Sequence, residues 1–287
     1  MELEKLFEQF LKEKIYVQNV ATSTLRFYRQ SFNAFTRNGG QLTKEGLKTF
    51  VINMSQTGIA IATRNLYIRG MNSFLTWLHE NDHTQERLRI KQMKQPQTVI
   101  KTFKDQHIKT LIGFRPRLFY EWRTHTMICA MIDTGIRRDE CASLTMSDVD
   151  FDNLFLKVKG KGSKERLVPF SYELRSLLYN WLKKRKAQNM QGEWLFPTAN
   201  ATKMILRNVN REVMLHCKSL GIEGVRMSPH SFRHYFAIHY LENGGDIYTL
   251  ARIFGHSSIK VTEIYLRSMG IDKIQKMQLR LSPMSKR

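Results

Sequence analysis

A single stretch of this chain alternates apolar and polar residues as a β-strand does, and this limits the folds open to it. Residues 154–159 read Leu-Phe-Leu-Lys-Val-Lys, and after a turn with two glycines, residues 166–170 return as Arg-Leu-Val-Pro-Phe. This pattern indicates a β-hairpin. Elsewhere apolar residues recur every three or four positions, which is typical of amphipathic helices. The expected fold class is therefore mainly α with a small antiparallel β-sheet.

The first 83 residues contain four predicted helices, near 2–16, 23–38, 43–57 and 62–80. Ser23 and Thr43 suit the caps of the second and third, and glycines follow both. We expect a small all-helical domain over residues 1–83. Its exposed faces carry basic residues suited to phosphate contacts: Lys44, Lys48, Arg64 and Arg69.

Residues 84–102 are polar and basic, show weak periodicity and contain Pro96. This composition predicts a basic interdomain linker. Residues 103–287 then form a second domain that contains the hairpin. Its remaining segments are predicted to be helical, near 104–112, 123–134, 173–186, 202–220, 229–243, 247–254, 259–267 and 273–281.

The charge of the chain indicates its class of partner. Lysine and arginine total 46 and aspartate and glutamate 25, which gives a net charge of +21 and a pI near 10. Such a balance predicts a polyanionic partner, with nucleic acid as the first expectation and an anionic membrane surface as the alternative. A membrane-surface helix concentrates its charge in one segment. Here both halves are basic, which favours nucleic acid.

Several classes of protein are disfavoured. No apolar run approaches the roughly 18–20 residues that span a bilayer, and the charged N-terminus does not resemble a signal peptide. The three cysteines form no CxxC pair, so neither a disulfide framework nor a zinc finger is expected. These features predict a cytoplasmic protein without a metal site.

Residues 228–234 read Ser-Pro-His-Ser-Phe-Arg-His. Ser228 suits a helix N-cap and Pro229 the first helical position. His230 and Arg233 then lie together near a helix N-terminus, where anions are favoured. The alternative is an ordinary capped helix with a basic first turn.

Residues 134–140 read Thr-Gly-Ile-Arg-Arg-Asp-Glu. Gly135 ends a buried helix, and Arg137 follows with Glu140 on the same face if a helical turn resumes. An arginine oriented by a carboxylate can direct its guanidinium at a phosphate. The alternative is a surface ion pair of little consequence.

Two further motifs are candidates. The hairpin tip, Lys159 to Arg166, places Lys161 between two glycines, although it lacks the P-loop pattern and could be a solvated turn. Residues 254–265 place His256 directly after Gly255 and Tyr265 on the following helix. Taken alone, that tyrosine would be interpreted as core packing.

Together and in this order, the four motifs resemble the tyrosine recombinases, or λ-integrase family, over residues 127–268. The family's first arginine and its acid fall on Arg137 and Glu140. The hairpin lysine falls on Lys161, in Gly-Lys-Gly-Ser-Lys-Glu-Arg-Leu-Val-Pro.

The HxxR pair of the family falls on His230 and Arg233, the second histidine on His256 and the nucleophile on Tyr265. No catalytic position is missing. Phe254 stands where leucine is usual, and Leu266-Arg267 follows the tyrosine where many members have a small polar residue and histidine.

The resemblance implies a role for each residue. Tyr265 would attack the scissile phosphorus to form a 3′-phosphotyrosyl bond. Arg137 and Arg233 would stabilise the phosphate charge. Lys161 would act as general acid and Glu140 as a positioning acid. His230 and His256 would add hydrogen bonds, one of them taking the tyrosine proton. Lys164 and Arg166 are expected to contact DNA.

The resemblance also implies an architecture and partners. The N-terminal helices would form a SAM-like core-binding domain, and the C-terminal α+β catalytic domain would end in an exchange helix near 271–282. The partner would be double-stranded DNA with an inverted-repeat core site, bound by a homotetramer that is monomeric or weakly oligomeric when free. Neither metal nor ATP would be required, and no membrane is expected.

The expected function is site-specific recombination through a Holliday junction. Alternatives are a type IB topoisomerase, a DNA-binding regulator without catalysis and a structural basic protein. Within the family, a chain with no arm-binding domain resembles Xer-type and transposon members, which favours resolution or simple integration.

Overall fold

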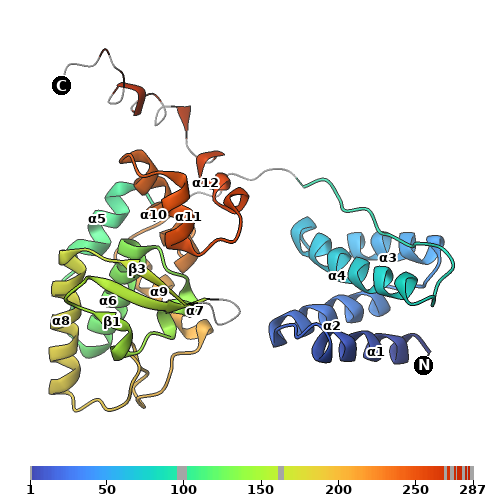
Figure 1. The fold of residues 1–287 in the computed structure, drawn as a ribbon, viewed down its shortest axis with the longest axis horizontal. Helices are drawn as coiled ribbons and strands as arrows, with labels where there is room; N and C mark the ends of the chain where they lie inside the picture. The colour runs from blue at the N-terminus through green and yellow to red at the C-terminus, as the bar shows by residue number, and fades with distance from the viewer. Residues whose placement is uncertain are drawn as a thin grey trace. The chain divides into compact units, whose positions relative to one another are not determined.

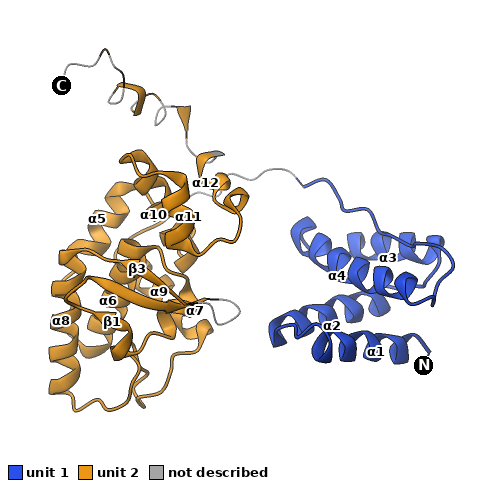
Figure 2. Cartoon of the chain, in the orientation of Figure 1, with its two compact units in different colours: residues 1–98 blue, residues 99–287 orange. Residues whose placement is uncertain are grey.

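The computed structural model describes residues 2–95, 102–160 and 165–267, and from there positions 270, 271, 275, 277–279, 282 and 284. The chain divides into two compact units, residues 1–98 and 99–287 (Figure 2). The predicted Lys161 and Lys164 lie outside the described residues, and so does much of the predicted exchange helix at 271–282. No described helix has the length and apolar character needed to cross a bilayer.

The first unit is a helical domain (Figure 1), and its core is rich in aromatic residues. Phe7, Phe10 and Phe74 are buried there, and the ring of Phe7 stacks on Phe32 with centroids 4.0 Å apart. Large rings at helical spacing supply most of the apolar area that a small domain can bury. Its helices are α1 (Glu2–Tyr16), α2 (Thr22–Arg37), α3 (Lys44–Gln56) and α4 (Ile61–Glu80).

Of the two helix caps predicted in this unit, one is observed. Thr43 caps α3, because its side chain accepts a hydrogen bond from the Gly46 amide at 3.0 Å. Ser23 does not cap α2, which begins one residue earlier and has Ala21 at its N-cap position without a side-chain bond.

Residues 84–95, the first part of the predicted linker, are bound to the first unit. Leu88 and Ile90 are buried in its core. The side-chain amide of Asn72 both donates to the Ile90 carbonyl and accepts from the Ile90 amide, each at 2.8 Å. Asn65 makes the same pair of bonds to Met93, at 2.9 and 2.8 Å. The prediction missed this because the bonds come from helix side chains distant in the sequence.

The second unit packs helices around a small sheet and confirms the predicted fold class. The sheet is antiparallel with order β1-β2-β3, and Leu156 pairs with Val168. Its elements are α5 (Asp105–Gly113), α6 (Phe119–Thr134), α7 (Arg138–Ala142), η1 (Met146–Asp148), β1 (Val149–Asp150), β2 (Phe155–Lys159), β3 (Glu165–Pro169), α8 (Tyr172–Ala187), α9 (Leu206–Ser219), α10 (Pro229–Glu242), α11 (Ile247–Phe254), η3 (Ile259–Val261) and α12 (Glu263–Arg267) (Figure 1).

The core of this unit positions the ends of its elements. Leu156, Val158 and Val168 are buried on one face of the sheet, in a cluster with residues of α6 and α8. α6 is buried almost throughout its second half. The two-residue strand β1 was not predicted, since two residues carry no periodicity. The predicted helix at 259–267 is instead the short 3₁₀ turn η3 followed by α12.

We predict that Asn72→Ala releases residues 84–95 from the first unit. Two hydrogen bonds to the Ile90 backbone are lost, which corresponds to about 1–3 kcal/mol and so roughly 5- to 150-fold faster exchange of that amide. Hydrogen exchange of Ile90 measures this directly. The control is Asn33→Ala on the exposed face of α2, which should leave the rate unchanged. Equal rates in both variants would contradict the bound arrangement.

Candidate active site

The first candidate residue, Arg137, is placed by the end of α6. Gly135 ends that helix in the left-handed region, with φ of 63°, and its amide bonds to the Met131 carbonyl. A Cβ at Gly135 would lie 2.7 Å from the rings of Phe236 and Phe254, so a side chain does not fit. The chain then turns, and Arg137 becomes the N-cap residue of α7, with Glu140 in the first turn of that helix.

The carboxylate of Glu140 is buried, with 3% of the residue exposed, and receives four hydrogen bonds from two arginines. The Arg137 amide donates to Oε2 at 2.7 Å and its guanidinium to Oε1 at 2.8 Å. Arg166 donates from its two terminal nitrogens at 2.8 and 2.9 Å. Burial alone would raise the pKa of Glu140, but the bonds from Arg166 and Arg137 outweigh it and lower the pKa to about 2.

Arg166, which the sequence predicted to contact DNA, makes three hydrogen bonds within the second unit. Its guanidinium binds two segments of the chain. Nε donates to the Ile253 carbonyl at 2.7 Å, and the two terminal nitrogens donate to the Glu140 carboxylate. Only 13% of its side chain is exposed. All three nitrogens are therefore used within the protein.

Arg233 is the most deeply buried cation of the site, with 4% of the residue exposed. It donates to the carbonyls of Gly135 at 2.7 Å and Phe254 at 3.0 Å. Its guanidinium also lies 3.6 Å from the Phe254 ring centroid, an arrangement that favours a cation. The phenylalanine that replaces the family's usual leucine thus packs against this arginine. Burial and Arg137 lower the pKa of Arg233 to about 10.

His256 bonds to Arg233 through one ring nitrogen and to Thr262 through the other. The Arg233–Nε2 distance is 3.0 Å and the Nδ1–Thr262 Oγ1 distance is 2.8 Å. Because arginine only donates, Nε2 accepts and we assign the proton to Nδ1, which donates to Thr262. Burial, Arg233 and Arg137 lower the pKa of His256 to about 4. Thr262 was missed in the sequence, because a single threonine carries no pattern of its own.

Tyr265 is buried, with 2% of the residue exposed. Its ring packs edge-on against Phe254 and beside His234, with centroids 5.7 and 5.4 Å apart. Its amide donates to the Thr262 carbonyl at 3.0 Å, so Thr262 is bonded to both His256 and the tyrosine. Phe254 likewise contacts both the Tyr265 ring and the Arg233 guanidinium.

His230 lies in the first turn of α10 and is exposed. Even so, partial loss of solvent and the charges of Arg226 and Arg233 lower its pKa. Pro229 opens this helix as predicted. Ser228 holds the N-cap position, but its hydroxyl lies 3.0 Å from that of Ser231 and makes no capping bond.

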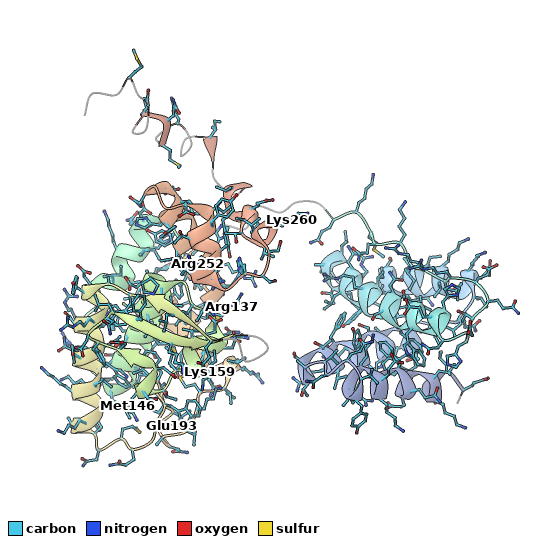
Figure 3. All side chains as sticks on the ribbon, in the orientation of Figure 1. Arg137, Met146, Lys159, Glu193, Arg252 and Lys260 are labelled. Atoms are coloured by element: carbon cyan, nitrogen blue, oxygen red, sulfur yellow. The ribbon has the colours of Figure 1, made fainter. Side chains whose placement is uncertain are left out.

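The structure therefore contains two contact pairs, Arg137 with Glu140 and Arg233 with His256 (Figure 3 labels Arg137). The two pairs meet through the backbone, because Arg233 binds the carbonyl of Gly135, two residues before Arg137, and Tyr265 packs on Phe254, whose carbonyl Arg233 also binds. Within the described residues, no group of three or more His, Cys, Asp or Glu is arranged to hold a metal ion. The predicted DNA contacts of the first unit stay predictions: Lys44 pairs with Glu86 at 2.6 Å, Lys48 and Arg69 are exposed, and Arg64 is partly buried.

Comparison with known proteins places this arrangement in context. The model of the phage integrase family matches residues 101–270. The tyrosine recombinase XerA of Pyrococcus furiosus is 27% identical over 255 residues, which cover 88% of this chain and 85% of the relative. The tyrosine recombinase XerD of Yersinia pestis is 28% identical over 276 residues, 91% of each chain.

Solved structures share the fold. The Tn1549 transposon integrase in complex with transposon right end DNA has a TM-score of 0.75 at 18% identity, over 96% of this chain and 99% of the other. XerH recombinase bound to a palindromic difH substrate has a TM-score of 0.72 at 16% identity, over 98% and 84%.

We predict that Glu140→Gln destabilises the second unit by about 3–5 kcal/mol at pH 7, because it leaves two guanidiniums without their buried anion. Hydrogen exchange over residues 99–287 in increasing urea measures the loss. The ionised carboxylate stabilises the fold above the ordinary pKa of 4.5 and loses this effect as the pH falls toward 2. The difference between wild type and variant should therefore shrink over that range.

The matched control is Glu165→Gln, which removes an exposed pair with Lys157 in the same unit. Its effect should stay below about 1 kcal/mol. A Glu140 variant no less stable than this control would contradict the buried ion network.

Proposed function

The chain belongs to the phage integrase family and is a tyrosine recombinase, and we propose that it cuts and rejoins double-stranded DNA with Tyr265 as nucleophile. The observation that carries the assignment is that the Arg137–Glu140 pair and the Arg233–His256 pair meet at the end of α6, where Arg233 binds the Gly135 carbonyl, with Tyr265 packed on the neighbouring Phe254.

In the proposed cleavage step, the Tyr265 oxygen bonds to the scissile phosphorus as the bond to the 5′-oxygen breaks. The products are a 3′-phosphotyrosyl linkage and a free 5′-hydroxyl, which in the reverse direction attacks the linkage on another strand. Arg137 and Arg233 hold the non-bridging oxygens, where charge accumulates in the transition state.

Proton transfers complete the step. His256 is neutral above its pKa of about 4, and its Nε2 lone pair faces Arg233. A phosphate that draws Arg233 onto its oxygens would free this nitrogen for a hydrogen bond or for the tyrosine proton. His230 is the second candidate base. Lys161, assigned from the family motif, protonates the leaving 5′-oxygen.

No metal or ATP takes part in this proposal. The arginines supply the positive charge that a metal ion provides in other phosphoryl-transfer enzymes, and the phosphotyrosyl bond conserves the energy needed for rejoining. Both follow from the proposed residue roles.

The proposed partner is duplex DNA with an inverted-repeat core site, bound by four protomers. The net charge of +21 supports a polyanion, and the integrase and XerH structures of similar fold hold DNA. A C-terminal segment near 271–282 passes between neighbouring protomers in this proposal. Four identical subunits in a closed ring fit two duplexes undergoing exchange.

We predict that Tyr265→Phe retains DNA binding and forms no covalent adduct, because the variant keeps the ring that packs on Phe254 and lacks the attacking oxygen. Nicked suicide duplexes should trap the wild-type protein in a denaturant-resistant adduct. Tyr240→Phe serves as the control and should form adduct normally. An adduct formed by Tyr265→Phe would show that another residue is the nucleophile. Relaxation of a plasmid by the wild-type protein without recombinant products would indicate a topoisomerase.

We predict that Lys161→Ala slows cleavage far more than it weakens DNA binding. The decisive substrate carries sulfur at the 5′-bridging position, since a thiolate leaves without a proton. Cleavage of this substrate by the variant should return to near the wild-type rate. If Lys161 only contacted a phosphate, its removal would instead lower the slope of log affinity against log salt concentration by about one unit. The sulfur substrate would then not restore cleavage by the variant.

A further inference from the structure

Arg166 touches three segments that the proposed reaction uses. It lies on β3, the strand that leaves the hairpin tip, and its terminal nitrogens bind Glu140, the carboxylate that also holds Arg137. Its Nε binds the Ile253 carbonyl at 2.7 Å, in the last turn of α11 and three residues before His256.

We propose that Arg166 is a positioning residue, which fixes Arg137 and His256 relative to β3 and makes no contact with DNA. The inference rests on the proposed function, because it names what positions that site. It also reverses the sequence-based prediction that Arg166 binds DNA.

The end of α11, directly before His256, packs against the Arg166 side chain. Gly255 ends α11 with φ of 62°, and a Cβ there would lie 3.0 Å from Cδ and 3.2 Å from Nε of Arg166. The arginine stem therefore occupies the space that any side chain at 255 would need. Glycine allows the α11 terminus to approach Arg166 closely enough for the Ile253 bond to form.

The bonding pattern requires the shape of a guanidinium. Nε and both terminal nitrogens lie in one plane and point at two acceptors on different segments, Glu140 and Ile253. A lysine ammonium at the same position keeps the charge but cannot make two parallel bonds to a carboxylate and a third to a carbonyl. Arg166→Lys therefore keeps the positive charge and removes the bonding geometry, so its effect reports the geometry alone.

This difference gives a direct test. If Arg166 positions the site, Arg166→Lys should slow adduct formation on a suicide duplex at saturating DNA by about tenfold or more. Its affinity should stay within about threefold of wild type with an unchanged salt slope, since no phosphate contact is lost. A phosphate contact predicts the reverse: lysine keeps the cleavage rate, and Arg166→Gln weakens binding and lowers the slope by about 0.9.

Lys157→Gln is the matched control, because it removes one cation from the neighbouring strand and leaves the Arg166 bonds intact. Lys157 pairs with Glu165 at 2.9 Å on the exposed part of the sheet. The control should keep the wild-type cleavage rate. Near-UV circular dichroism gives the folded fraction of each variant, to which the rates are normalised.

A double-mutant cycle with Glu140→Gln tests whether the effect passes through the carboxylate. If it does, the double variant cleaves about as slowly as Glu140→Gln alone; independent roles would multiply the two losses. A wild-type rate for Arg166→Lys would overturn the inference while the proposed function stands, and multiplying losses would overturn its Arg137 part, since the effect would then pass through the Ile253 bond and not through Glu140. A wild-type protein that forms no adduct with any duplex would overturn both.

Discussion

The active site depends on one buried carboxylate shared by two arginines. A carboxylate removed from water is stable as an anion only when N–H groups replace the lost solvent. Glu140 obtains them from the turn that begins α7 and from β3, which ties the end of α6 to the sheet. Through the third nitrogen of Arg166, the same network reaches the end of α11. Segments far apart in the sequence thus meet at one charged group.

A second cation lies beside this network without a carboxylate of its own. Arg233 relies on two backbone carbonyls and the face of Phe254, which accommodate a guanidinium without neutralising it. Three arginines and one carboxylate therefore leave the site with an excess of positive charge. The low pKa of His256 is a consequence of this field together with burial. A preformed positive field in a largely desolvated site suits the charge of a pentacoordinate phosphate.

Local patterns in the sequence predicted much of this structure. The period of the apolar residues located most helices and the hairpin. Gly135 and Gly255 marked helix ends, because glycine readily adopts the left-handed conformation found there and a Cβ at either position would lie against a neighbouring side chain. The motif residues were found from their order and spacing. Contacts between side chains far apart in the sequence could not be predicted from such local patterns. The Asn72 bonds to Ile90, the Arg166 bonds to Glu140 and Ile253, and the Thr262 bond to His256 depend on a folded chain.

The ionisation of Glu140 tests the central claim most directly. Carbon-13 NMR of the side-chain carboxyl, followed against pH in the wild-type protein, reports the charge of this one group. Because four N–H groups stabilise its anion, the account predicts a midpoint of about 2 in the folded protein. A midpoint near 4.5, the ordinary value for glutamate, would show that the two arginines do not hold an ionised carboxylate and would contradict the account.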